Sequence, residues 1–147
     1  MSARTETGAC FCGAVAAELT GEPFWICYDH DDDCRRAIGA ALVVWVGYRP
    51  DQVRFTHGEP KRFSKTSGVV RSFCADCGTS ISYEDAGTPG ELYLSLGFLD
   101  RPERFRPQAH AYWRMKLPWL EIADAFPKID AYSRDRDPDL GFPNERE

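Results

Sequence analysis

Four cysteines stand in two close pairs whose thiolates are suited to hold one metal ion. The pairs are Cys10 with Cys12 and Cys74 with Cys77, and a glycine follows each pair. In an extended segment residues i and i+2 share a face, so the sulfur atoms of the first pair can converge, and a tight turn can bring the second pair together. Zinc favours tetrahedral sulfur ligation in closed structural sites. We therefore predict a structural zinc ion held by all four cysteines.

A redox dithiol is the alternative explanation for the second pair. A redox C-x-x-C motif normally begins a helix in a βαβ setting, whereas the residues around Cys74 and Cys77 have the composition of strands. A redox role would also leave the first pair unexplained. Zinc bound by thiolates contributes about 10–16 kcal/mol to folding, which is comparable to the net stability of a whole domain.

The cysteine motifs and several later residues resemble one known family. In chain order the likeness rests on Gly8-Ala-Cys10-Phe-Cys12-Gly-Ala-Val15, Cys34-Arg35-Arg36, Phe73-Cys74-Ala-Asp-Cys77-Gly-Thr79, Leu99-Asp100, His110 and Lys116-Leu-Pro-Trp119. These residues resemble the glutathione-dependent formaldehyde-activating enzyme family, also called the centromere-protein-V-like domain. The likeness runs from about Gly8 to Phe126, and its most specific part is C-x-C-G followed by C-x-x-C-G-T.

The resemblance carries expectations about the fold and the chemistry. It implies a β-rich fold around a structural zinc with four cysteine ligands, and a second, catalytic zinc held by a C-H-C-x-x-C-R segment. The activity it implies is the addition of a glutathione thiol to formaldehyde or the reverse reaction. Zinc at such a site can stabilise a thiolate or polarise a carbonyl oxygen. Glutathione is thus the expected co-substrate, and a small thiol with an aldehyde is the expected partner.

This chain departs from the family at the second metal site. Its corresponding segment begins Asp29-His30-Asp31 and continues to Cys34, so two of the three ligand cysteines are aspartates. In one interpretation Asp29, Asp31 and Cys34 hold a second zinc or another divalent ion, because carboxylate oxygen is also a zinc ligand and is harder than thiolate. In another, Cys27, His30 and Cys34 supply the ligands, although His30 faces away from Cys27 in a regular strand.

In the third interpretation the second metal is lost. The acidic run is then a solvated loop whose carboxylates pair with Arg35 or Arg36, as runs of one charge commonly do. A protein of this kind would be a non-catalytic, zinc-stabilised binding domain. The two arginines are also candidates to bind a carboxylate of glutathione, because the guanidinium fork matches a carboxylate.

The leading functional hypothesis is a carbon–sulfur lyase-like enzyme that acts on a glutathione-type adduct of an aldehyde. Its candidate catalytic residues are Cys34, Asp31, Asp29, His30 and Arg35. The retained Cys34 and His30 favour this hypothesis, and the paired loss of two thiolates favours the binding domain.

Short strands must position these groups, because no stretch keeps a helical period for long. The expected strands are Ala14–Thr20, Phe24–Tyr28, Leu42–Tyr48, Val53–Thr56, Lys61–Lys65, Val69–Phe73, Thr79–Tyr83, Leu92–Gly97, Ala109–Trp113 and Trp119–Ile122. Frequent Gly and Pro breaks between short strands indicate a mainly β, sandwich-like domain of several coiled sheets with little helix. We expect this zinc-binding domain to span residues 8–130 and a polar tail to span 131–147.

Composition limits the partners. The net charge is −5 and Lys and Arg form no block, so nucleic acid is an unexpected partner. The N-terminus has no apolar signal segment, and the longest nearly apolar run, Ala37–Gly47, is too short for a bilayer that needs about 20 residues. We expect no membrane partner and a cytoplasmic location, where reduced thiols favour metal over disulfides. The sequence leaves the oligomeric state open.

Overall fold

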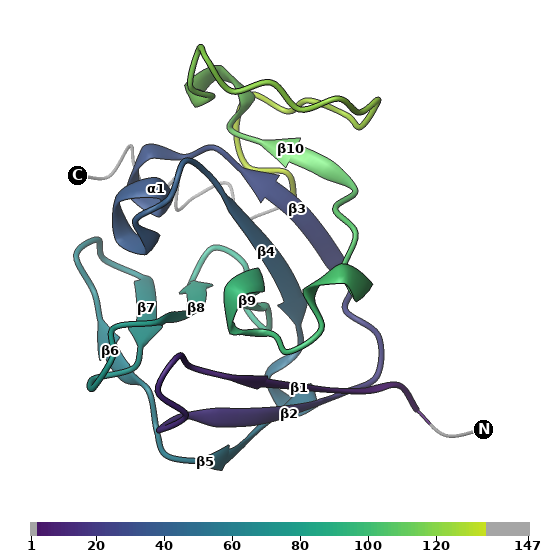
Figure 1. Cartoon of the computed structure of the whole chain (residues 1–147). Coiled ribbons are helices and arrows are strands. Elements are labelled where there is room, and N and C mark those ends of the chain that lie inside the picture. Colours follow the sequence, from purple (N-terminus) through teal and green to yellow (C-terminus); the bar gives the residue numbers. More distant parts are fainter. Residues whose placement is uncertain (1–2, 135–147) are drawn as a thin grey trace.

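Two β-sheets organise residues 3–134, the part of the chain that the computed structural model describes (Figure 1). The smaller sheet has the order β1 (Thr5–Ala9), β2 (Ala16–Thr20), β5 (Val53–His57). The larger sheet has the order β10 (Ala109–Ala111), β3 (Trp25–Asp29), β4 (Val43–Tyr48), β9 (Leu92–Ser95), β8 (Ser80–Asp85), β7 (Val69–Phe73), β6 (Lys61–Phe63). Strand β10 runs parallel to β3, and the other neighbours are antiparallel.

One α-helix, α1 (Asp32–Ile38), lies between β3 and β4 in the described part of the chain. The carboxylate of Asp31 caps its N-terminus by accepting a hydrogen bond from the backbone N–H of Cys34, and Gly39 ends it in the left-handed conformation. Acidic residues occupy its first turn and arginines its last, which suits the helix dipole. Single 3₁₀ turns make up the other helical elements: η1 (Pro50–Gln52), η2 (Leu96–Phe98), η3 (Pro102–Arg104) and η4 (Trp113–Met115).

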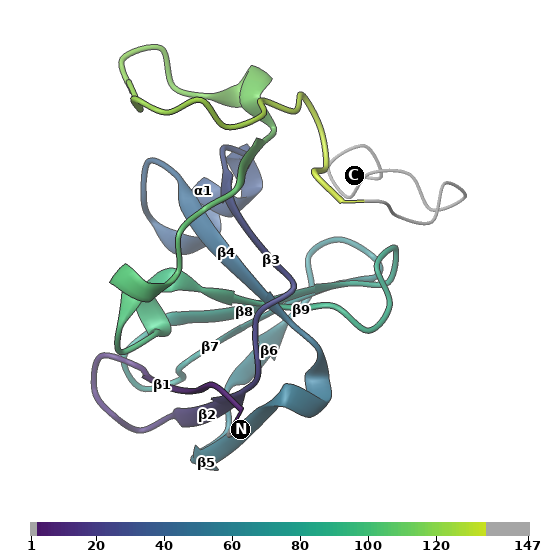
Figure 2. The ribbon, with the colours of Figure 1, turned by 90° about the vertical axis from the view of Figure 1, so that its right-hand side faces the viewer.

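Strand β4 lies at the centre of the core and is buried along its whole length. Val44 and Val46 belong to the apolar cluster that also takes in Leu19 of β2, so this cluster fills the space between the two sheets. Trp45 points to the opposite face, where a second cluster includes Tyr83 and Tyr93. Figure 2 shows the smaller sheet below the larger one. The central strand thus supplies side chains to a core on both faces of the large sheet.

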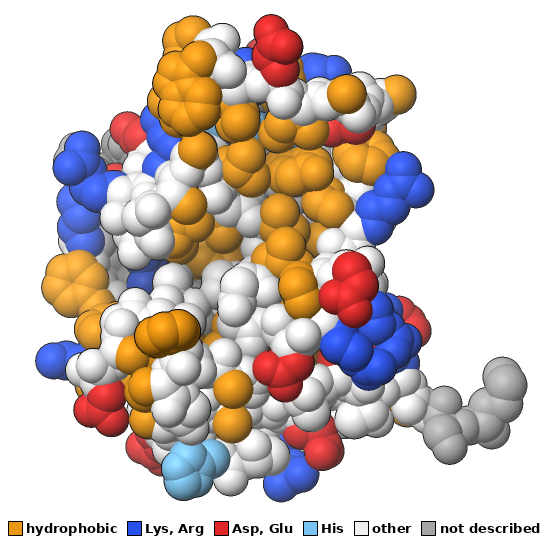
Figure 3. Space-filling view, viewed as in Figure 1, with side chains coloured by type: hydrophobic (Ala, Val, Ile, Leu, Met, Phe, Trp, Pro, Cys, Tyr) orange, Lys and Arg blue, Asp and Glu red, His pale blue; other side chains and the backbone are white. Residues whose placement is uncertain are grey.

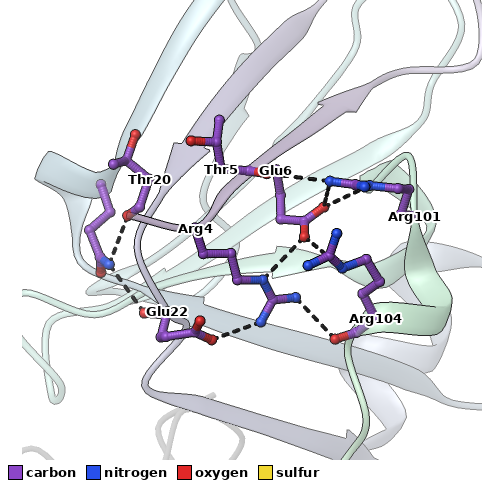
Figure 4. Close-up of polar contacts among 8 residues, drawn as sticks. Arg4, Thr5, Glu6, Thr20, Glu22, Arg101 and Arg104 are labelled. Carbon is purple, nitrogen blue, oxygen red and sulfur yellow. Dashed lines mark hydrogen bonds and ion pairs between the residues drawn. The ribbon is translucent and has the colours of Figure 1, made fainter. Parts of the chain in front are cut away.

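A buried carboxylate ties the first strand to a distant turn (Figure 4). Glu6 of β1 is 1% exposed, and the guanidinium groups of Arg4, Arg101 and Arg104 lie 3.0–3.1 Å from its two oxygens. The charges of these arginines outweigh the effect of burial, which by itself would raise the pKa of Glu6, and the net result is a lowered pKa. The cluster therefore stabilises the ionised carboxylate and holds β1 against η3.

Hydrophobic side chains gather over the upper half of the face seen in Figure 3, where β3, β4 and β10 lie, and charged groups lie mostly at its margins. The smaller sheet covers only the lower part of the large one in this view. No helix of the described residues is long and apolar enough to cross a membrane.

The expected fold class, mainly β with little helix, is confirmed. Three details of the predicted elements differ from the structure, and the first is that α1 was not predicted. Residues 119–122 form no strand and belong to an arm that returns along β10, where Lys128 bridges His110. Strand β1 was not predicted, because its residues are mostly small or polar, but β2 pairs with it along its whole length. Of the predicted tail, residues 135–147 lie outside the described part, whereas Arg134 forms an ion pair with Glu91.

Candidate functional site

The four cysteines predicted to hold zinc come together. Their sulfur atoms all lie within 4.8 Å of one another, with 3.7 Å between Cys10 and Cys12 and 3.8 Å between Cys12 and Cys74. A zinc ion about 2.3 Å from each of four sulfurs in a tetrahedron requires sulfur–sulfur distances of about 3.8 Å. The distances fit a four-coordinate zinc ion, and Cys77 completes the set.

Two short turns aim these sulfur atoms. The first follows β1 and the second joins β7 to β8, and in each a glycine adopts a positive φ, 80° at Gly13 and 79° at Gly78. Each turn is closed by hydrogen bonds, from Gly13 N–H to the carbonyl of Cys10 and from Gly78 N–H to the carbonyl of Cys74. Because non-glycine residues rarely adopt this conformation, each glycine after a cysteine pair has a structural reason.

Thr79 connects the two turns. Its hydroxyl accepts a hydrogen bond from the backbone N–H of Phe11 at 3.0 Å and lies 3.2 Å from the sulfur of Cys77. Hydrogen bonds from the Thr79 side chain and backbone lower the pKa of Cys77 to about 5. Such contacts orient ligands and favour the thiolate that binds metal. Thr79 therefore orients Cys77 and ties the two cysteine turns together.

The second group of predicted residues lies at the end of β3 and the start of α1. Asp29 Oδ1 accepts a hydrogen bond from the backbone N–H of Asp31, and Asp29 Oδ2 lies 3.5 Å from the sulfur of Cys34. Asp31 caps α1 through the backbone N–H of Cys34 at 3.1 Å. The local helix start thus brings Asp29 and Cys34 side by side, and Asp31 holds the turn.

A cavity of about 390 Å³ opens beside this group, within the range of small-molecule sites. It lies between α1 and strands β6, β7 and β8, and it extends from Asp29, Asp31 and Cys34 to Gly78 of the zinc-binding turn. Its aromatic walls include Tyr83 of β8 and, from later in the chain, Tyr112 and Tyr132. None of these three tyrosines was predicted from the sequence to lie at the site.

Arg71 of β7 is a cavity residue that was not predicted from the sequence. Both terminal nitrogens of its guanidinium lie 3.6 Å from the sulfur of Cys34, and its carbon lies 4.9 Å from the centre of the Tyr83 ring. Val69, Arg71 and Phe73 of β7 line the cavity, and so does Ser72, where the pairing of β7 with β8 becomes irregular. The sequence signal for Arg71 was a single charged residue in a short, otherwise uncharged strand directly before the C-x-x-C motif.

Burial shapes the acidity of this group. It raises the pKa of Asp29 to about 7, and the nearby charge of Asp31 contributes in the same direction. Burial also raises the pKa of the Cys34 thiol well above its usual value. Cys34 therefore stays a protonated thiol at neutral pH, and its S–H donates a hydrogen bond to Asp29 Oδ2.

His30 points away from the cavity. Its Nε2 lies 2.9 Å from Nδ1 of His110, whose Nε2 lies 2.8 Å from a carboxylate oxygen of Asp124. Both rings are fully buried, and burial lowers the pKa of His30 to about 4, with the neighbouring His110 acting in the same direction. The structure thus separates His30 from Asp29 and Cys34 and joins it to the arm that packs on β10.

The two adjacent arginines have different environments. The Arg35 guanidinium donates to the backbone carbonyls of His30 and Met115, so it braces the start of α1 against η4. Arg36 lines the cavity, and within residues 3–134 its guanidinium makes no hydrogen bond or ion pair. Of the two arginines, Arg36 is therefore the one at the cavity wall.

The second set of predicted metal ligands does not fit a metal as the cysteine set does. In the described part of the chain, metal-sized groupings of three or more ligand atoms are the four cysteines and Asp31, Asp32 and Asp33. Asp29 and Cys34 belong to neither grouping, Asp31 caps the helix, and the Arg71 cation contacts the Cys34 sulfur. The combination of Cys27, His30 and Cys34 is not brought together either, because His30 faces His110.

The fold and the cysteine cluster define a small β protein with a candidate structural zinc centre next to a cavity. The sequence profile of the glutathione-dependent formaldehyde-activating enzyme family matches residues 5–115, and the chain belongs to this family. Among solved structures, the crystal structure of a Rhodobacter sphaeroides protein is similar, with a TM-score of 0.54 at 19% identity over 83% of this chain and 98% of that one. At this identity the likeness shows the fold alone. No curated protein matches the chain.

Proposed function

We propose that the cavity beside Asp29, Cys34 and Arg71 binds a glutathione-type adduct of an aldehyde and makes or breaks its carbon–sulfur bond. Membership of the family suggests this class of reaction. The observation that carries the proposal is the placement of a carboxylate, a thiol and a guanidinium on one wall of a cavity large enough for a small molecule.

The reaction needs one proton transfer and one charge to be stabilised. In the cleavage direction, Asp29 takes the proton from the hydroxyl group of the adduct and the carbon–oxygen bond becomes a carbonyl. The carbon–sulfur bond then breaks, and its electron pair stays on sulfur as a thiolate. A positioned carboxylate can supply general base catalysis of this kind, and Arg71 provides positive charge on the same wall.

Other residues would bind and position the substrate. Arg36 is free to pair with a carboxylate of the thiol at the cavity wall. Tyr83, Tyr112 and Tyr132 provide aromatic surface that limits water around the reacting atoms. A zinc ion held by the four cysteines would fix the turn that contributes Gly78 to the cavity, and it would have no open position for the substrate.

Exchange between ¹³C-labelled formaldehyde and its glutathione adduct, followed by NMR, tests this proposal. Zinc-loaded protein is expected to accelerate the exchange, and Asp29→Asn should slow the catalysed rate about 100-fold, because general base catalysis contributes about 10²–10⁴-fold. The matched control is Asp32→Asn, since Asp32 is exposed on α1 and outside the cavity lining. Equal loss in both variants, or no acceleration by the wild type, would contradict the proposal.

A second candidate is a binding domain without catalysis. It is favoured by the engagement of Cys34 with both Asp29 and Arg71, which leaves the thiol without an open face for chemistry. Titration calorimetry with S-methylglutathione, an adduct analogue that cannot react, separates the two candidates. Binding that depends on Arg36, together with no acceleration of exchange, would select the binding domain.

A further inference from the structure

We propose that the Arg71 guanidinium takes the place of the second metal ion in this chain, so that each molecule binds one zinc ion, at its four cysteines. The resemblance to the family implies a second ion close to Cys34, and the residues present there do not fit one. The number of bound metal ions can be measured whether or not the protein cleaves an adduct.

The ligand types at this site differ from those of the family motif. Asp29 and Asp31 stand where the family motif has cysteines, and carboxylate oxygen is a harder ligand that selects zinc less strongly than thiolate sulfur does. Both aspartates already have local partners. Asp29 accepts a hydrogen bond from Asp31 N–H, and Asp31 accepts one from Cys34 N–H, so each carboxylate helps to form the turn into α1.

The sulfur atom of Cys34 already has partners on two sides. A metal ion must bond to a lone pair of the Cys34 thiolate, and both terminal nitrogens of Arg71 point at this sulfur from 3.6 Å. The thiol faces Asp29 on its other side at 3.5 Å. Cys34 is 3% exposed, so its sulfur has little surface left for a further ligand. The guanidinium and the carboxylate together occupy the positions that a metal would need.

The Arg71 cation also disfavours a metal ion at Cys34 by charge repulsion. The Arg71 guanidinium is held between the Tyr83 ring, 4.9 Å from its carbon, and the Cys34 sulfur. A divalent ion bound at Cys34 would lie next to this cation in a partly buried site, where like charges repel more strongly than in water. A guanidinium supplies a permanent positive charge because it does not lose its proton in proteins. The chain therefore keeps a cation at this wall without a metal.

Metal analysis of the full chain tests the inference. Protein dialysed against excess zinc and then freed of loosely bound ions should contain one zinc per molecule by mass spectrometry. Cys34→Ser should leave this number at one, and Cys74→Ser should lower it toward zero. Cobalt substitution of the wild type should give the absorption of a single tetrathiolate site. Two zinc ions in the wild type, or one ion lost in Cys34→Ser, would overturn the inference.

Arg71→Met tests the role of the cation directly, because it removes the charge and keeps an aliphatic side chain. With added zinc this variant should take up a second ion, and the double variant Arg71→Met/Cys34→Ser should not. Arg62→Met is the matched control, since Arg62 lies on the neighbouring strand β6 and is exposed, and it should keep one ion. A single ion in Arg71→Met would show that its charge does not exclude the metal. If Arg71→Met does not fold, the counts for the wild type and Cys34→Ser decide.

Discussion

Arg35 and Arg36 are neighbours in sequence with opposite surroundings. The guanidinium of Arg35 donates hydrogen bonds to two backbone carbonyls. The guanidinium of Arg36 lines the cavity and has no hydrogen-bond or ion-pair partner among the described residues. Sequence reasoning treated the two alike as carboxylate binders and gave Arg35 a catalytic role. That role remains untested, but the geometry assigns Arg35 to bracing the start of α1.

The cavity arginine should set the preference for an acidic thiol. Arg36→Met is expected to raise the KM for the glutathione adduct of formaldehyde about 10-fold, because one charge-assisted hydrogen bond to a carboxylate contributes roughly 1.5 kcal/mol. The adduct of 2-mercaptoethanol, which has no carboxylate, should be unaffected. Steady-state kinetics with both adducts measure the difference.

Arg54→Met is the control for the loss of a surface arginine, since Arg54 lies on β5 and pairs with Glu18. An equal rise in KM for both adducts would mean that Arg36 shapes the cavity instead of binding the carboxylate. An unchanged KM for both would remove Arg36 from substrate binding.

Single residues also show what could be predicted from the sequence and what could not. Each pair of cysteines is a local sequence pattern that fits half of a tetrahedral metal site, and the structure confirms that the two pairs converge. The partner of Cys34 is different, because Arg71 is 37 residues away and reaches it only through the pairing of the large sheet. The cavity is likewise a product of packing, and no local pattern indicates it.

At the scale of elements, the two zinc-binding turns are joined by one hydroxyl group. Thr79 accepts a hydrogen bond from the first turn and contacts a cysteine of the second. Because such contacts typically account for 10–100-fold of metal affinity, Thr79→Val should weaken zinc binding by about 10-fold while the four thiolates remain.

Competition with a chromophoric chelator measures this change in affinity. Thr56→Val is a suitable control, since Thr56 is exposed on β5 and distant in sequence from both turns. Cys74→Ser gives the lower limit of zinc affinity, because we expect this variant to lose zinc and to be unfolded or insoluble. Thr79→Val that holds zinc as firmly as the wild type would contradict the proposed link.

Helix α1 is the element that the sequence contained and our prediction missed. Asp31 as N-cap, two acids in the first turn, two arginines in the last and Gly39 after the end are all standard helix signals. In the sequence, the acidic run was considered for metal ligation or a solvated loop, and these helix signals were not used. Strands were easier to predict, because β4 and β7 have the β-branched and aromatic composition of buried strands.

At the scale of the whole molecule, the Glu6 cluster links the N-terminal strand to a turn about 95 residues later. The ordinary pKa of glutamate is about 4.5, and the three arginines lower the pKa of Glu6 in the folded state. A group with a lowered folded pKa stabilises the fold above its unfolded pKa, and this contribution is lost as the pH falls through the folded pKa. The cluster should therefore contribute to stability at neutral pH and not in strong acid.

Glu6→Gln should lower the free energy of unfolding by roughly 2 kcal/mol at pH 7, because it removes the buried carboxylate that three partly exposed arginines share. The difference between variant and wild type should shrink as the pH falls below about 4.5. Urea unfolding at a series of pH values measures both effects. Comparing the two proteins at each pH cancels the loss of zinc from protonated thiolates.

Glu59→Gln serves as the reference for a change of net charge, since Glu59 is exposed and outside the cluster. A Glu6→Gln variant whose stability differs from the wild type by the same amount at every pH would show that the carboxylate acts through packing alone.

The distance along the chain between the two cysteine pairs has a consequence during synthesis. Cys12 and Cys74 are 62 residues apart, so the first pair leaves the ribosome well before its partners exist. At about 5–20 residues per second this interval lasts roughly 3–12 s. For that time two thiols in an incomplete chain are open to oxidation or to the wrong metal. We therefore expect the supply of zinc and of reducing equivalents to limit how many new chains reach the native state.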